Sequence, residues 1–148
     1  MSVTFREARR EDVPAVVALL ADDMLGRERE REDLAAYLAA FDAMAQEGGN
    51  RLIVGEESGE VVATYQITFI SGLSLAAARR AQVESVRVAA KLRGRAIGEA
   101  MFADAEARAR AGGCKLMQLT MNVARKDARR FYERIGFEPS HLGFKKAL

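Results

Sequence analysis

The chain of 148 residues contains a single cysteine, Cys114, a single histidine, His141, and no tryptophan. One cysteine excludes an internal disulfide and agrees with a reducing compartment. Together the two residues leave too few ligands for a zinc site, and no calcium-loop spacing is present, so we expect no metal. No stretch approaches the roughly 18 apolar residues that span a membrane. The N-terminus also lacks the apolar run of a signal peptide. We therefore expect a cytoplasmic protein with no membrane partner.

An excess of charge of one sign is also missing. The chain has 23 Lys and Arg against 21 Asp and Glu, a formal net charge of +2. This is too weak to indicate nucleic-acid binding from net charge. Aromatic residues do not alternate with the basic residues, so stacking on single strands is not expected either. Apolar residues, in contrast, are abundant. They make up 49% of the chain, which is enough to form one full hydrophobic core. We see no repeat or linker and expect a single domain over residues 1–148.

Hydrophobic periodicity predicts the order β-α-α-β-β-β-α-β-α-β. Apolar residues at helical spacing predict helices over 13–24 (ended by Gly26), 31–47, 96–111 and 127–135. Short apolar and alternating runs predict strands over 3–6, 51–56, 61–70, 83–88 and 116–121, with one or two more within 137–146. A turn at Glu57–Glu60 joins the second and third strands into a hairpin, and residues 71–81 are expected to form a loop.

This order of elements indicates the mixed α/β class. Three consecutive strands followed by a strand–helix–strand unit imply a central mixed sheet flanked by helices. The helix over 96–111 is the expected right-handed crossover that joins the strands 83–88 and 116–121 in parallel.

The most informative stretch runs from Val86 to Glu99, where a short basic turn containing glycine separates a strand from a helix. A helix N-terminus offers unpaired N–H groups and partial positive charge, and Lys91, Arg93 and Arg95 add full charges. This is the chemistry of a pyrophosphate cradle. Many turns of this composition bind nothing, however, and the P-loop and dinucleotide-binding glycine patterns are both absent.

Two segments resemble signatures of the GNAT superfamily of N-acetyltransferases. Arg93–Gly98 (RGRAIG) resembles the acyl-CoA signature Arg/Gln-x-x-Gly-x-Gly/Ala, and Arg129–Phe137 (RRFYERIGF) resembles the family's C-terminal "FYerlGF" segment. The order of elements also matches. The chain departs at Ala96, where the first signature glycine is usual, and at Arg125, where many members carry asparagine. A methyl group at position 96 is accommodated if φ is negative and clashes if φ is positive.

The resemblance implies that acetyl-CoA is the co-substrate. Backbone groups of Val86 and Val88 would pair with the pantetheine arm, and amides of Arg93–Gly98 would hold the pyrophosphate. Arg129 or Arg130 would reach the adenosine phosphate. The implied contact residues are Val86, Arg87, Val88, Arg93, Gly94, Arg95, Ala96, Ile97, Gly98, Glu99, Asn122, Arg125, Ala128, Arg129 and Phe131.

The resemblance also implies two catalytic residues, Tyr132 as general acid beside the sulfur and Glu84 as the base that deprotonates the amine, often through water. Attack on a thioester needs a neutral amine, so a group must take its proton. Both residues have ordinary alternatives. Tyr132 shares a helical stripe with Ala128 and Ile135 and can be a core residue, and Glu84 can be a solvated strand residue.

We therefore predict an N-acetyltransferase that acts on a primary amine of a small or amino-acid-like acceptor. Segments 20–31 and 70–81 are expected to build the acceptor site. A peptide or protein amine, a degenerate acyl-CoA sensor and a basic nucleic-acid binder remain as alternatives, in that order. Edge strands near the C-terminus also allow a homodimer.

Overall fold

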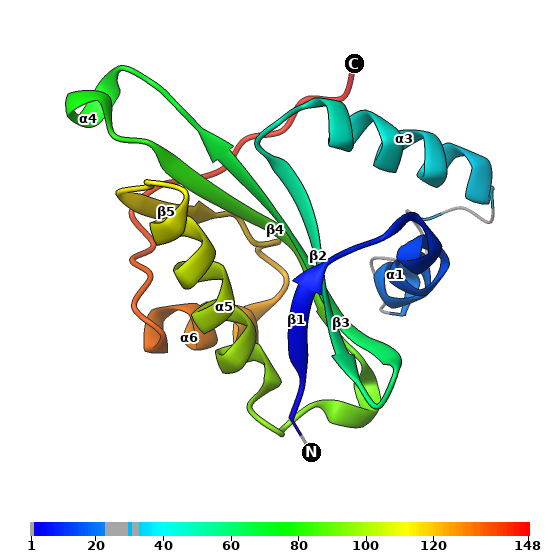
Figure 1. Ribbon diagram of the computed structural model, residues 1–148. Coiled ribbons are helices and arrows are strands. Elements are labelled where there is room, and N and C mark those ends of the chain that lie inside the picture. The colour runs from blue at the N-terminus through cyan, green and yellow to red at the C-terminus, as the bar shows by residue number, and fades with distance from the viewer. Residues whose placement is uncertain (1, 23–29, 31–32) are drawn as a thin grey trace.

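A five-stranded sheet forms the centre of the protein (Figure 1). The computed structural model describes residues 2–22, 30 and 33–148. The strands lie side by side in chain order: β1 (Thr4–Glu7), β2 (Asn50–Glu57), β3 (Glu60–Ile70), β4 (Arg80–Val88) and β5 (Leu116–Leu119). The first four pair antiparallel, and β5 runs parallel to β4. The mixed sheet predicted from the sequence is confirmed.

Helices cover both faces of this sheet. One side carries α1 (Val13–Ala21) and α3 (Leu34–Gln46), and the other carries α5 (Ile97–Ala111) and α6 (Lys126–Arg134) (Figure 1). Three short elements complete the described chain: η1 (Arg10–Asp12), α4 (Ser74–Ala77) and η2 (Ala90–Leu92). The predicted end of the first helix at Gly26 and the predicted start of the second at Arg31 lie outside the described residues. Among the helices described here, none has the length and apolar content to cross a membrane.

The main hydrophobic core lies between the sheet and α5. One stripe of α5 is buried, made of Ile97, Met101, Phe102, Ala105 and Ala109. It packs with buried strand residues that include Ile53, Tyr65, Ile67, Ala81 and Val83. Burying a large apolar side chain contributes about 1.5–3 kcal/mol. This packing fixes the N-terminus of α5 beside the end of β4, which is where the sequence places its basic turn.

Two local predictions are corrected by the structure. β4 begins at Arg80 rather than Val83, because the ladder with β3 continues until Ile70 pairs with Arg80. The residues between these strands include α4, in which Leu75–Ala77 have positive φ, so it is a left-handed turn.

The third correction concerns the C-terminal end. The described residues after α6 contain no strand, although the sequence predicts one or two within 137–146. From residue 137 onward, the described backbone hydrogen bonds join Phe137 N–H to Tyr132 C=O and Ser140 N–H to Glu138 C=O. The segment Glu138–Leu148 is exposed throughout. Among the described residues, no strand pairs with this segment.

Candidate active site

The parallel strands β4 and β5 part at their carboxyl ends. The last pair in their ladder joins Val83 to Leu119, whereas β4 continues to Val88. The edge of Glu84–Val88 that faces away from β3 therefore has no strand partner among the described residues. Its backbone donors and acceptors are available to an extended ligand that adds like a strand. In open α/β sheets, ligands bind at the carboxyl ends of the strands.

A β-bulge shapes the same part of β4. The register with β3 shifts between Thr64 and Gln66, so Ser85 and Val86 together oppose Tyr65. Ser85 has φ +55°, a conformation that non-glycine residues seldom adopt. A bulge bends its strand and increases the local twist. Here it lies between Glu84 and the unpaired residues that follow, so it sets the direction in which Val86 and Val88 present their backbone groups.

The turn that enters α5 carries two residues with positive φ, Gly94 at +85° and Ala96 at +59°. Backbone N–H groups in such turns converge and form a concave anion site. The N–H groups of Ile97, Gly98 and Glu99, in the first turn of α5, have no hydrogen-bond partner among the described residues. The local geometry fits a pyrophosphate cradle. The φ of Ala96 is therefore positive, which is the strained conformation of the two considered for this position.

Replacing Ala96 by glycine is expected to stabilise the protein by about 0.5–1 kcal/mol. A left-handed conformation costs an L-residue about 1–2 kcal/mol, and the added entropy of a glycine in the unfolded chain offsets part of the gain. Urea denaturation of wild type and Ala96→Gly measures the difference. Ala103→Gly is the matched control, since Ala103 is exposed within α5 and glycine there should destabilise by about 1 kcal/mol. A lower denaturation midpoint for Ala96→Gly would contradict the strain argument.

The basic side chains of the turn divide into two groups. Lys91 forms an ion pair with Glu60 at 2.8 Å, and Arg95 forms one with Glu57 at 3.0 Å. These pairs anchor the turn to the β2–β3 hairpin. Arg93 is exposed and has no ion pair in the described structure. Arg93 is therefore the cation of this turn that is available to a phosphate group.

Gly98 brings α5 and α6 into close contact. A Cβ atom built on Gly98 would lie 3.1 Å from the ring of Phe131, tighter than side chains normally pack. Glu99, next in the chain, accepts a hydrogen bond from Arg134 at 2.9 Å, and the Arg134 guanidinium lies 5.5 Å from the Phe131 ring centre. The side-chain positions of Gly98 and Glu99 thus serve helix packing. This leaves their backbone amides for ligand binding.

Tyr132 lies in an aromatic cluster formed by residues of α5 and α6 and by Phe137, which follows soon after the end of α6. Its ring packs edge-to-face against Phe102 at 5.5 Å, Phe131 at 5.5 Å and Phe137 at 6.0 Å between centroids. Burial raises the pKa of the Tyr132 hydroxyl, and the positive charge of Arg125 and, to a smaller extent, of Arg87 partly offsets this. The hydroxyl has no hydrogen-bond partner among the described residues. The hydroxyl is therefore protonated at neutral pH, and its proton is not used in a hydrogen bond that stabilises the described structure.

Glu84 is exposed at the end of the paired part of β4. Its carboxylate accepts a hydrogen bond from Gln82 Nε2 at 3.3 Å, and Gln82 Oε1 accepts one from Gln118 Nε2 on β5 at 2.7 Å. Gln82 thus links the two strands and orients Glu84. Sequence reasoning missed both glutamines. The available signal was spacing, because residues two apart on a strand share a face.

The remaining predicted contacts lie around the start of α6. Asn122 accepts a hydrogen bond from the N–H of Ala124 through Oδ1 at 2.9 Å, which closes the turn before the helix. Arg129 bonds Glu133 at 2.8 Å, whereas Arg130 is exposed without a recorded ion pair in the described chain. Ala128 N–H bonds Arg125 C=O at 3.2 Å in the first turn. Among the described residues, no hydrogen bond joins Glu84 to Tyr132.

This arrangement agrees with comparison to known proteins. A model of the Acetyltransferase (GNAT) family matches residues 13–137. The chain belongs to this family. The GNAT chain is 32% identical to aminoalkylphosphonate N-acetyltransferase of Salmonella typhimurium over 143 residues, which covers 97% of this chain and 90% of the relative. It is an enzyme of the GNAT acetyltransferase class.

Two solved structures share the GNAT fold of this chain. One is described as a transcriptional regulator from Bacillus halodurans C-125, with 41% identity, a TM-score of 0.95, and coverage of 99% of this chain and 100% of the other. Glucosamine-6-phosphate N-acetyltransferase from Arabidopsis thaliana has 19% identity, a TM-score of 0.81, and coverage of 99% of each chain. The latter similarity concerns the fold alone. In the described part of the GNAT chain, no cluster of three or more metal-ligating side chains is found.

Proposed function

We propose that this GNAT acetyltransferase is a cytoplasmic enzyme that transfers an acetyl group from acetyl-CoA to the primary amine of a small or amino-acid-like acceptor. The observation that carries the proposal is the unpaired edge Glu84–Val88 next to the amide-rich turn before α5. Because the Salmonella relative is named for aminoalkylphosphonates, these compounds are the first acceptors to test. No observation favours a peptide acceptor.

The residues present fit acetyl-CoA, whose thioester, when bound, is already activated toward amines. The backbone of Val86 and Val88 would hold the pantetheine arm, as an added strand is held. The amides of Ile97–Glu99 would hold the pyrophosphate at the positive end of α5. Arg93 and Arg130, both exposed and without recorded ion pairs in the described chain, would meet the remaining phosphate charge.

Proton transfer is the task left to the side chains. An alkylamine is mostly protonated near neutral pH, so Glu84 would take a proton from the ammonium group, directly or through water. The departing sulfur needs a proton or a hydrogen bond, which the protonated hydroxyl of Tyr132 would donate. Gln82, fixed by Gln118, would keep the Glu84 carboxylate in place. No covalent attachment to the protein is required.

Acetyl-CoA is expected to bind the wild-type protein and to raise its Tm. A ligand that binds only the folded state stabilises that state by mass action. Titration calorimetry and thermal unfolding at near-physiological salt measure both effects. Thiol release with aminoalkylphosphonates and a broader amine panel then measures turnover. Absence of binding by acetyl-CoA and CoA at sub-millimolar concentration would refute the proposal, and binding without turnover of any amine would favour a sensor.

A further inference from the structure

Polar side chains form a row across the face of the sheet that α5 does not cover. On β4, Ala81 and Val83 are buried in the core that includes α5. The residues at alternate positions therefore lie on the opposite face, and these are Arg80, Gln82 and Glu84. The adjacent strands pair polar residues with this stripe in register: Gln66 and Thr68 of β3 and Gln118 of β5.

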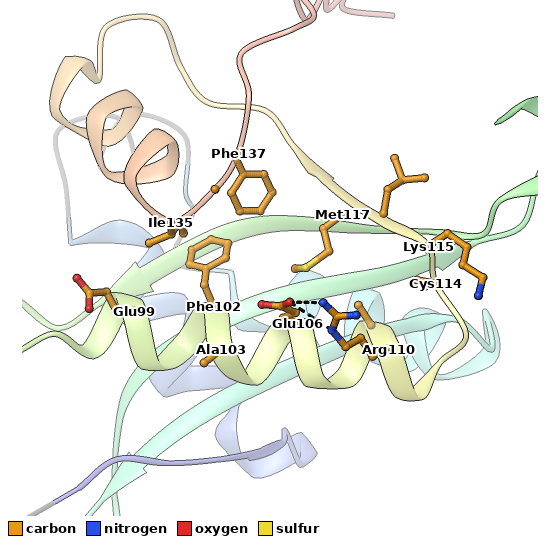
Figure 2. Close-up of a pocket in the computed structure, with 13 residues that line it drawn as sticks. Glu99, Phe102, Ala103, Glu106, Arg110, Cys114, Lys115, Met117, Ile135 and Phe137 are labelled. Atoms are coloured by element: carbon orange, nitrogen blue, oxygen red, sulfur yellow. Dashed lines mark hydrogen bonds and ion pairs between the residues drawn. The ribbon is translucent and has the colours of Figure 1, made fainter.

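The same alternation is visible on β5. Met117 points toward α5 in the close-up of the pocket beside that helix (Figure 2). Gln118, the next residue, consequently faces the other way, as does Gln82, its partner in the ladder. On this side of the sheet lie α1 and α3 (Figure 1), yet every residue of the row stays at least partly exposed. The row is therefore a polar surface that a small molecule can reach.

Arg80 differs from the other members of the row in having no partner. Gln118 donates a hydrogen bond to Gln82, which donates one to Glu84. The side chain of Arg80 is half-buried, forms no hydrogen bond or ion pair with a described residue, and has its Nε shielded from solvent. The neighbouring Arg79, in contrast, bonds a backbone carbonyl just after α5 at 2.9 Å. A shielded donor without a partner costs free energy, so Arg80 indicates a missing anion.

The position of Arg80 separates this anion from the coenzyme phosphates. Arg80 begins β4, and at about 3.3 Å per residue its backbone lies about 13 Å from that of Glu84. The amide-rich turn before α5 follows the other end of β4, beyond Val88. Coenzyme phosphates held at that turn would thus lie past Glu84, away from Arg80. The anion that meets Arg80 has to come from the second substrate.

We propose that Arg80 binds an acidic group of the acceptor while Glu84 receives its amine. The acceptor is then an amine that carries a phosphonate, phosphate or carboxylate a few bonds away. Two long side chains span most of the distance between their backbones and leave room for a short molecule over Gln82. An arginine can form two parallel N–H···O bonds with such a group, which adds geometric selectivity. The inference rests on the proposed acetyl transfer and assigns the acceptor's acidic group to one residue.

Steady-state kinetics with three acceptors of equal length test this assignment: 2-aminoethylphosphonate, 3-aminopropanoate and propylamine. The wild type should prefer the two anionic amines. Arg80→Gln should lower their kcat/KM by about 30-fold or more, the usual effect of losing a charge-assisted hydrogen bond, and should spare propylamine. The loss should appear mainly in KM, because Arg80 holds the acceptor before and during the reaction. Arg80→Lys should restore part of the efficiency, since it keeps the charge and loses the fork.

Arg51→Gln is the matched control. Arg51 is also an arginine on a strand, but it lies opposite Ile67 on the other face of the sheet and pairs with Glu7. Its variant should keep the preference of the wild type. Equal use of propylamine and the anionic amines by the wild type would overturn the assignment of Arg80, and so would an equal loss on all three amines in Arg80→Gln. Either result would leave the proposed acetyl transfer standing.

Calorimetric titration of 2-aminoethylphosphonate into the protein saturated with CoA tests the site without turnover. The wild type should bind this amine, and Arg80→Gln should bind it about 30-fold more weakly or worse. Binding that depends on Arg80, without acetylation of any amine, would refute the proposed acetyl transfer and support the anion site. Absence of binding by the wild type, or the same affinity in both proteins, would refute the anion site.

Discussion

Glu84→Gln is expected to lower kcat by about 10²–10⁴-fold, the usual value of a general base. Glutamine has the shape of glutamate and keeps an oxygen that can accept the hydrogen bond from Gln82. It has lost the ability to take a proton from the acceptor's ammonium group. The loss should be greatest at low pH, where little free amine is present, and acetyl-CoA affinity should stay near that of the wild type.

The measurement is a pH–rate profile at saturating acetyl-CoA, once an acceptor has been identified. Glu7→Gln is the matched control, because Glu7 is also exposed at the end of a strand but lies on β1 at the opposite edge of the sheet. Its profile should overlay that of the wild type. If the Glu84→Gln profile does so too, Glu84 is not the base, and water or a backbone carbonyl must take the proton.

Tyr132→Phe is expected to lower kcat about tenfold or more, equivalent to about 1.4 kcal/mol of activation free energy. The substitution keeps the ring and its contacts with Phe102 and Phe137 and removes only the hydroxyl. That hydroxyl makes no hydrogen bond to a described residue, so stability should hardly change. This expected loss of kcat is small for a general acid, because a thiolate is a fair leaving group even without protonation.

The pH dependence gives a second readout for Tyr132. Burial raises its pKa above the ordinary value of about 10, so the wild type should keep its proton donor throughout the neutral and mildly alkaline range. Tyr65→Phe is the matched control, because the Tyr65 hydroxyl donates to Asp104 inside the core. That variant should lose about 0.5–1.5 kcal/mol of stability and keep its kcat. Equal kcat values for Tyr132→Phe and wild type, with chemistry rate-limiting, would make Tyr132 a packing residue.

The sequence predicted most of the fold because the stripe of α5 and the alternation of the strands carry a strong periodic signal. The helix predicted over 96–111 is observed as Ile97–Ala111, and the strand predicted over 51–56 as Asn50–Glu57. The turn between β4 and α5 was also predicted correctly, but from its composition and not from periodicity. Its glycine and basic residues can be recognised from the local sequence alone. Its candidate role as the coenzyme site came from resemblance, not from periodicity.

What the sequence did not reveal depends on partners distant in the chain. The positive φ of Ala96 belongs to a turn held by Lys91 and Arg95, whose ion-pair partners lie 31 and 38 residues earlier. The closeness of Gly98 to Phe131 requires the docked positions of two helices. The C-terminal segment is a different case, because the sequence predicts one or two strands within 137–146 and the described structure contains none there.

The order of the strands also has a consequence for biosynthesis. Because β1 to β5 lie in the sheet in the order in which they are translated, each strand from β2 onward leaves the ribosome when its neighbour is already available. Domains fold from the N-terminus during synthesis where their contacts permit it. The antiparallel meander of β2, β3 and β4 can therefore assemble early, and the half that carries the amide-rich turn, β5 and Tyr132 joins it last. A nascent chain that ends before α6 would contain all five described strands and would lack the proposed proton donor.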